Sequence, residues 1–389
     1  MSLQISYTHQ HFRNRYGICI STFTETLLLT KCQYERHWLN PGDTSVIWLG
    51  LVYSMMTIAL QSYHRAGDEP PEYRGKSWQV SSDYRRLTAQ CLMLADITQP
   101  ITHMLETLVL HVYSEYARSR DAEVGVLLSV SIIVRLAMRM GYHRDAGPYP
   151  NISPFQGEMR RRVWMAVRQS DILFSSQAGL PPMVRNREMD TEFPRNLHDD
   201  EIYEDIKVLP PSRPNSDITA ASYMIAKARL MYLYGMVVEE SQSLVGSSYE
   251  DIMKLDQRLR ELHTSLAPHL QMRTIEESVR DTASVIMQRF SLDLIYLKSI
   301  CVLHRKFLGA SRENSRYAYS RRTCIDASMT MLQHQATLHT ECQPGGRLRS
   351  AKWFISSLTT PRLPDGGNGG CTRSLSYGRS RTPREAPWW

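Results

Sequence analysis

The stretch from residue 124 to residue 200 constrains the fold of this chain more than any other part of the sequence. Its first part repeats apolar residues at steps of three and four, the pattern of an α-helix with one apolar face. Gly141 follows the last periodic residue, where a glycine typically ends a helix. A second helix is predicted to begin after Ser153, because Ser153 and Gln156 form a capping box around Pro154 at the first helical position.

The second predicted helix carries charged and aromatic side chains on one face. Arg161, Trp164, Arg168 and Asp171 recur at steps of three and four, an order suited to a cation–π contact and an intrahelical ion pair. Apolar residues occupy the adjoining face, which we expect to be buried: Met159, Val163 and Val167. Taken alone, the polar ladder predicts a buried Arg–Asp pair and a proline-fixed loop covering the core. The predicted structural motif comprises Glu158, Arg161, Arg162, Trp164, Arg168, Asp171, Gly179 and Pro181.

The order of short motifs along this stretch resembles a known family. The motifs are Met140-Gly141-Tyr142-His143-Arg144-Asp145, Pro154-Phe155, residues 158–164, Asp171, Gly179-Leu180-Pro181, Asp190-Thr191 and Pro194-Arg195-Asn196. Together they resemble the middle homology region of fungal transcription factors of the zinc binuclear cluster class. The resemblance covers most of residues 30–310 and implies an all-helical regulatory domain in a nuclear transcription regulator. It does not imply that this chain binds DNA.

The cysteines depart from the pattern of that family. Its members carry six cysteines in a compact basic module near the N-terminus, whereas this chain has only Cys19 and Cys32 in its first 90 residues. The zinc cluster expected for the family therefore lacks its cysteines here, and no cofactor is predicted. The seven cysteines are scattered and never form C-x-x-C, as is typical of reduced thiols in the cytosol or nucleus.

The charge of the chain is concentrated at its C-terminal end. Of the net charge of +7, eight basic and two acidic residues from Gln343 onward supply +6, which leaves +1 for residues 1–342. A near-neutral body does not indicate a broad phosphate-binding face. The best membrane candidate, residues 46–60, is too short to span a bilayer, so we predict a buried helix and no membrane partner. The N-terminus shows no secretory signal.

The remaining chain predicts further helices at residues 24–39, 44–65, 82–95, 101–118, 220–242, 247–265, 278–309 and 321–339. In the segment 278–309 we expect the apolar residues inside and Asp293 and Lys298 near the rim. The predicted fold class is all-α, a multi-helix antiparallel bundle-like regulatory domain over residues 24–342. An N-terminal segment, residues 1–23, precedes it. A disordered basic tail rich in Gly, Ser, Arg and Pro, residues 343–389, follows it.

Enzyme and metal motifs were weighed against this interpretation. The chain has no G-x-S-x-G, no G-x-G-x-x-G and no P-loop, and residues 143–145 spell a kinase triplet without the glycine-rich loop or Asp-Phe-Gly that a kinase needs. Four metal-ligating residues match no zinc spacing: Cys324, His334, His339 and Cys342. An all-helical, terpene-handling enzyme would need acidic motifs on facing helices, and Asp199-Asp200-Glu201 comes closest. We predict that the chain is not an enzyme.

The predicted function is a nuclear fungal transcription regulator of a metabolic or secondary-metabolite gene set. Its expected partners are other transcription factors or a second copy of the chain, with DNA contacted indirectly. The 19 methionines and 20 tyrosines suit an adaptable apolar pocket for a small-molecule effector, and core packing explains them equally well. Two alternatives stay open: a truncated regulator fragment without activity, and the all-helical enzyme.

Overall fold

The computed structural model describes residues 37, 39–118, 124–343 and 345–348. Over these residues the chain forms ten α-helices, joined by loops and short 3-10 turns, and no strand, which confirms the all-α prediction. The helix predicted at residues 24–39 lies almost entirely outside the described residues. The predicted segment 1–23 and residues 349–389 of the predicted tail also lie outside them.

Every helix predicted from residue 44 onward is present. The helices are α3 Val46–Ala66, α4 Ser77–Leu94, α5 Met104–Arg118, α6 Val124–Arg139, α7 Pro154–Ala178, α8 Ala220–Gln242, α9 Tyr249–Thr264, α10 Ala283–His304, α11 Phe307–Ala310 and α12 Ala318–Glu341. The largest difference concerns the predicted helix at 278–309, which begins later and divides into α10 and α11. Thr282 caps α10 by accepting a hydrogen bond from the Val285 N–H, so the helix begins after Thr282.

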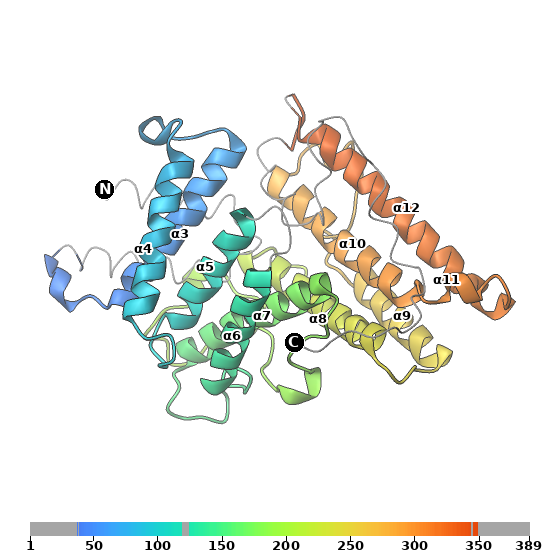
Figure 1. The fold of residues 1–389 in the computed structure, drawn as a ribbon, viewed down its shortest axis with the longest axis horizontal. Coiled ribbons are helices and arrows are strands. Elements are labelled where there is room, and N and C mark those ends of the chain that lie inside the picture. Colours follow the sequence, from blue (N-terminus) through green and yellow to red (C-terminus); the bar gives the residue numbers. More distant parts are fainter. Residues whose placement is uncertain (1–36, 38, 119–123, 344, 349–389) are drawn as a thin grey trace, which may run out of the picture.

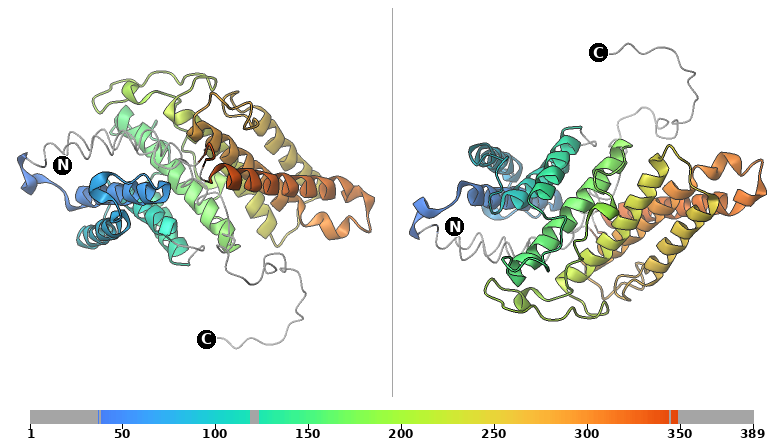
Figure 2. Two further views of the ribbon diagram at one scale, coloured as in Figure 1. Left: turned by 90° about the horizontal axis from the view of Figure 1, so that it is seen from above. Right: turned by 90° about the horizontal axis from the view of Figure 1, so that it is seen from below.

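The helices form two groups joined through the middle of the molecule. Helices α3 to α6 pack together on one side, and α8 to α12 pack together on the other (Figure 1). The two groups meet where α7 packs against α6 and α5 on one side and against α8 on the other. The views from above and below show the same arrangement (Figure 2). Helix α7 is therefore the element that both groups share.

Helix α3 is the most apolar helix of the first group. Within the described residues it is the one helix long and apolar enough to cross a membrane, and 78% of its most apolar window is buried. Trp48 and Leu51 are among its fully covered side chains, and the helix packs against α4 and α5. This is the burial expected of a core helix, in line with the prediction for residues 46–60.

The prediction for α10 needs one correction. Asp293 was expected near the rim, but only 7% of it is exposed, whereas Lys298 is partly exposed as predicted. Helix α10 contacts α8, α9 and α12, so α12 covers the face that the sequence pattern left open to solvent. Arg289, one turn before Asp293, is also buried. Helix α10 is thus a central helix with buried charges.

Candidate functional site

Local hydrogen bonds fix both ends of α7. The Ser153 side chain accepts from the Gln156 N–H, and the Gln156 side chain accepts from the Ser153 N–H, each at 3.2 Å, which confirms the predicted capping box. Gly141, which follows α6 in the segment leading to α7, and Gly179, which follows α7, adopt φ angles of 75° and 72°. Residues with a side chain rarely adopt this left-handed conformation. Gly179 follows the last turn of α7, and its neighbour Leu180 donates to the Ser175 carbonyl at 2.9 Å. These residues set how the chain enters and leaves the helix.

Arg168 and Asp171 form a buried ion pair within α7. Arg168 Nη1 lies 2.9 Å from Asp171 Oδ2, and the side chains are 0% and 1% exposed. The predicted intrahelical pair is therefore present, one turn apart along the helix. The Arg168 guanidinium also lies 5.9 Å from the ring centroid of Tyr232 on α8. Because a buried charge is costly without partners, this pair requires its neighbours to stay in place.

The loop after α7 supplies further partners to the same carboxylate. The backbone N–H groups of Met183 and Val184 donate to Asp171 at 2.9 and 3.2 Å. Gly179 and Pro181 are themselves exposed, so their part is to turn the chain back toward the helix. Asp171 thus holds the loop 179–184 against α7, as the sequence predicted for a loop covering the core.

Arg161 pairs with the loop that precedes α7. Its Nε and Nη2 atoms each lie 2.8 Å from an oxygen of Asp145, in the loop before α7. Asp145 also accepts from the backbone N–H groups of Gly147 at 2.9 Å and Glu192 at 3.1 Å. The Arg161 hydrogen bonds lower the pKa of Asp145 to about 2 against the opposing effect of burial. The kinase-like Asp145 is therefore a structural partner of Arg161.

Glu158 and Arg162 form the third pair of α7. Glu158 is fully buried, and its Oε1 accepts from Arg162 Nε at 3.1 Å and from the Arg195 backbone N–H at 3.1 Å. The next residue, Asn196, donates from its side chain to the Pro214 carbonyl at 2.9 Å and accepts from Thr219. Thr219 caps α8. The segment around residue 195 therefore ties the start of α8 to α7.

Trp164 takes a role that differs from the predicted cation–π contact. Only 1% of it is exposed, and its indole N–H donates to Met189 Sδ at 3.4 Å. The cation–π contacts around α7 join other residues: Arg160 lies over Tyr142 at 4.2 Å, and Arg168 over Tyr232. Trp164, Arg168 and Asp171 are buried, and Arg161 is partly covered. Helix α7 lies between two helical groups and has no solvent face there.

The motifs that carry the family resemblance therefore meet in space. We call this set the α7 network: Glu158, Arg161, Arg162, Trp164, Arg168 and Asp171, with the loop groups that they bind. Two further contacts close it, from Thr191 Oγ1 to the Tyr142 carbonyl at 2.7 Å and from the Asp190 N–H to the His143 carbonyl at 3.1 Å. Chemically, this arrangement positions loops around a helix, because its carboxylates are bound by arginine side chains and loop N–H groups.

Sequence reasoning missed a second set of buried polar residues. Asp293 on α10 accepts from His263 on α9 at 2.8 Å and from His334 on α12 at 2.6 Å. Nearby on α9, Asp256 accepts from His304 at 3.1 Å, Arg260 at 2.9 Å and Tyr319 at 2.8 Å. We call this set the α9–α12 network: Asp256, Arg260, His263, Asp293, His304, Tyr319 and His334.

Hydrogen bonding governs the ionisation of the two aspartates in this network. Burial alone would raise the pKa of Asp256, but hydrogen bonds from His304, Arg260 and Tyr319 outweigh it and lower that pKa to about 2. The same balance, with His263 and His334 as donors, lowers the pKa of Asp293. One signal of Asp256 was visible in the sequence. It falls on the same helical face as Ile252 and Leu259, where a charge needs a buried partner.

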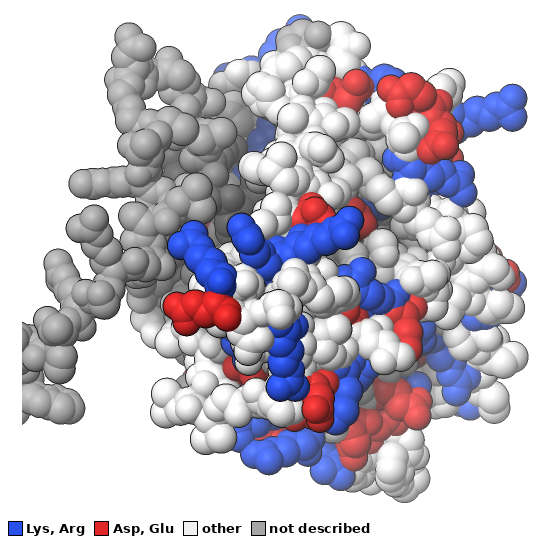
Figure 3. Space-filling view, turned by 90° about the vertical axis from the view of Figure 1, so that its right-hand side faces the viewer, with Lys and Arg blue, Asp and Glu red and all other residues white. Residues whose placement is uncertain are grey.

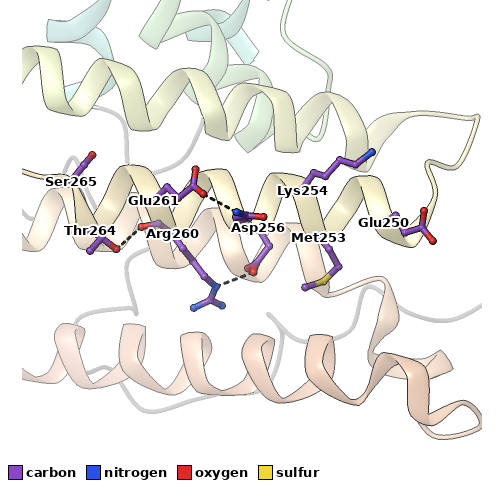
Figure 4. Close-up of a pocket in the computed structure, with 9 residues that line it drawn as sticks. Glu250, Met253, Lys254, Asp256, Arg260, Glu261, Thr264 and Ser265 are labelled. Atoms are coloured by element: carbon purple, nitrogen blue, oxygen red, sulfur yellow. Dashed lines mark hydrogen bonds and ion pairs between the residues drawn. The ribbon is translucent and has the colours of Figure 1, made fainter.

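An open groove of about 860 Å³ runs along α9. Figure 4 shows Met253, Asp256 and Arg260 pointing toward α12, and the other lining residues are mostly charged or polar. Met253 is its one methionine and it has no tyrosine, so it is not the apolar Met- and Tyr-lined pocket that an effector hypothesis requires. On the face toward α11 and α12, basic and acidic residues are interspersed (Figure 3).

The residues weighed for metal binding are held by other groups. Within the described part of the chain, no three His, Cys, Asp or Glu side chains are arranged to hold a metal ion. His334 binds Asp293, and the Cys342 thiol contacts the Leu348 carbonyl at 3.5 Å. The acidic run Asp199–Glu201 forms a short 3-10 turn, in which Glu201 pairs with Arg213 at 2.7 Å.

Comparison with known proteins gives one family. Residues 6–283 match the model of the fungal specific transcription factor domain. The chain is 40% identical over 326 residues to the Zn(2)-C6 fungal-type transcription factor pigI of Monascus ruber, covering 84% of this chain and 40% of that protein. It is 37% identical to the pyrrolocin cluster transcription factor fsdR of Fungal sp., covering 84% and 44%. It is 33% identical to the equisetin cluster transcription factor eqxF of Fusarium heterosporum, covering 84% and 47%.

These matches also set the extent of the likeness. The chain spans less than half the length of each of these three relatives. No solved structure matches the chain. The relatives are transcription factors and not enzymes, which agrees with the absence of enzyme motifs from the sequence.

Proposed function

Because the chain belongs to the family of the fungal specific transcription factor domain, we propose that it regulates a secondary-metabolite biosynthetic gene set. The observation that carries this proposal is its identity of 33 to 37% with regulators named for the equisetin and pyrrolocin clusters. Membership of this family of transcription factors implies a nuclear location for the chain. The chain would supply the helical regulatory domain, whose loops the α7 network holds in place.

The proposed mode of action is recruitment by a partner protein or by a second copy of the chain. Its support is electrostatic. Residues 1–342 carry a net charge of +1, and the face toward α11 and α12 shows both signs interspersed, whereas proteins that bind the DNA backbone present basic surfaces. We therefore propose that DNA is contacted through a partner.

Chromatin association of the tagged protein in its native host, matched with transcript profiling after deletion, tests the proposal. We expect occupancy at the promoters of one biosynthetic gene set and a coherent change in its transcripts. A protein that stays off chromatin while no transcripts change would refute it. Asp171→Ala, which should disrupt the α7 network, is expected to lose occupancy. Asp83→Ala, at an exposed pair with Arg86, should keep it and serves as the matched control.

The oligomeric state separates the two modes of recruitment. The chain has a mass of 44.9 kDa. Sedimentation at twice that mass would support a homodimer. Sedimentation as a monomer, together with a DNA-binding protein that copurifies from cross-linked nuclei and occupies the same promoters, would support a partner.

A further inference from the structure

Two cysteines face each other across the contact between α10 and α12. Cys301 Sγ lies 3.8 Å from the Cys324 carbonyl oxygen, and Cys324 Sγ lies 3.7 Å from the Cys301 carbonyl oxygen. Each thiol therefore donates to the backbone carbonyl of the other residue. Both are reduced in this structure. This reciprocal position brings both thiols to one point of the contact between α10 and α12.

The two thiols differ in exposure. Cys301 is partly exposed, and its sulfur lies 3.3 Å from the hydroxyl of Ser328, an exposed residue of α12. Cys324 is 4% exposed. A small solute from solvent therefore reaches Cys301 first, while Cys324 is placed behind it to react second.

The ionisation of the pair matches this order. The neighbouring Cys324 thiol lowers the pKa of Cys301 to about 7, although burial opposes it. The Cys301 thiol and burial raise the pKa of Cys324. By contrast, burial alone raises the pKa of Cys91, on α4. Since the thiolate is the nucleophile, Cys301 is the reactive cysteine of the pair.

We propose that Cys301 and Cys324 form a reversible, peroxide-responsive disulfide that locks α12 onto α10. The Cys301 thiolate attacks one oxygen of hydrogen peroxide, the O–O bond breaks, and hydroxide leaves with a solvent proton as water. The Cys324 thiol then attacks the resulting sulfenic sulfur. The S–S bond forms, and the sulfenic oxygen leaves with the thiol proton as a second water. Two thiols are oxidised and one peroxide is reduced.

The cross-link would act on the α9–α12 network. Tyr319 and His334 on α12 reach Asp256 on α9 and Asp293 on α10, and Cys324 lies between them in the sequence of α12. A covalent bond at this point would hold these contacts together when α12 would otherwise detach. This inference does not depend on the proposed function, because it concerns only thiols within the chain.

Peptide mapping of the full-length protein after hydrogen peroxide treatment tests the proposal. Under non-reducing conditions we expect a cross-linked peptide that joins Cys301 to Cys324, reversed by dithiothreitol. The oxidised protein should melt on the order of 5 °C higher than the reduced protein, since the bond closes a loop between residues 23 positions apart. Recovery of both residues as separate peptides, or disulfides formed mainly by other cysteines, would overturn the proposal.

Three variants assign the two steps. Cys324→Ser should stop at the sulfenic acid, detected as a dimedone adduct on Cys301, and Cys301→Ser should give neither adduct nor cross-link. Cys91→Ser is the matched control and should behave as the wild type. If either variant fails to fold, the rate of iodoacetamide labelling of the reduced wild type decides the first step. Cys301 must label faster than Cys91, and the reverse order would refute the assignment.

Discussion

The α7 network and the α9–α12 network differ in how far apart along the sequence their hydrogen-bonded partners lie. Each buries carboxylates and surrounds them with donors. In the first, Asp171 binds Arg168 three positions away and Met183 twelve positions away. In the second, Asp256 binds His304 and Tyr319 at separations of 48 and 63 positions. The first network therefore shapes one helix and its flanking loops, whereas the second joins three helices that are distant in the chain.

Because the partners differ in this way, loss of a carboxylate should affect the structure differently in the two networks. Loss of Asp171 releases a loop and leaves the Arg168 charge buried within a single helix. Loss of Asp256 weakens the junction of α9, α10 and α12 but leaves Arg260 with its side chain 43% exposed, where water can replace the aspartate. The α7 network should therefore be the more sensitive of the two.

The largest effect is expected for Asp171→Ala. The substitution leaves two backbone N–H groups without their acceptor and leaves the buried Arg168 guanidinium with only the more distant Asn186 and Glu239, at 3.5 and 3.9 Å, which should lower the free energy of unfolding by about 3 to 5 kcal/mol. Urea denaturation followed by circular dichroism measures it. The matched control is Asp83→Ala, since Asp83 and Arg86 form an exposed pair with the same three-residue spacing and should contribute less than about 1 kcal/mol. Equal losses in the two variants would contradict a buried ion pair at Asp171.

The second prediction concerns the pH dependence of Asp256. Its pKa falls from the ordinary 3.8 to about 2 on folding, which contributes about 2 kcal/mol above pH 5. Because the folded pKa is the lower one, this stability is present above 3.8 and is lost as pH falls toward 2. Urea denaturation should therefore show that the stability gap between wild type and Asp256→Asn narrows by about 1 kcal/mol from pH 5 to pH 3.

A second variant in the same network checks the source of that pH dependence. Tyr319→Phe removes one of the three hydrogen bonds to Asp256 and should cost about 1 kcal/mol at pH 5. The difference in the free energy of unfolding between Tyr319→Phe and the wild type should also be smaller at pH 3 than at pH 5. A gap for Asp256→Asn that stays constant or widens on acidification would show that Asp256 is not the titrating group.

The same contrast in sequence distance explains what could be predicted. Gly141, the Ser153 capping box and Gly179 were found because each signal lies within a few residues of the helix end that it sets. The Arg168–Asp171 pair was found because its spacing is one helical turn. Partners contributed by loops, such as Asp145 for Arg161, were not found, since loop closure carries no periodic pattern.

Contacts between helices that are far apart in the sequence could not be predicted either. Asp293 was misplaced at the rim, because the helical pattern of α10 shows which positions share a face but not that α12 covers that face. Its partners His263 and His334 come from helices 30 and 41 positions away. Asp256 was missed, and although it lies on the same helical face as Ile252 and Leu259, nothing local identifies His304 as its partner.

A third prediction tests whether the opening of α7 is coupled to that of α8. Gly235 on α8 faces α7, and a Cβ there would lie 3.0 Å from Ile172 Cδ1. Gly235→Ala should therefore push α8 from α7 and lower the free energy of unfolding by about 1 to 2 kcal/mol. Hydrogen exchange should show faster opening of both helices. Gly309→Ala in α11 is the control, because no heavy atom lies within 4 Å of its Cβ position, and exchange confined to α8 would argue against coupling.

The smallest expected effect compares the N-cap residues of α7 and α10, Ser153 and Thr282. Ser153 makes a full capping box with Gln156, whereas Thr282 accepts one hydrogen bond, of 3.4 Å, from the Val285 N–H. Ser153→Ala should cost about 1 kcal/mol, and Thr282→Ala about half of that, measured by urea denaturation at pH 7. The reverse order would mean that the long-range packing of α10, rather than local hydrogen bonding, makes a helix start sensitive to its cap. In that case the cap at Ser153, which the sequence predicts, would contribute less to stability than the cap at Thr282.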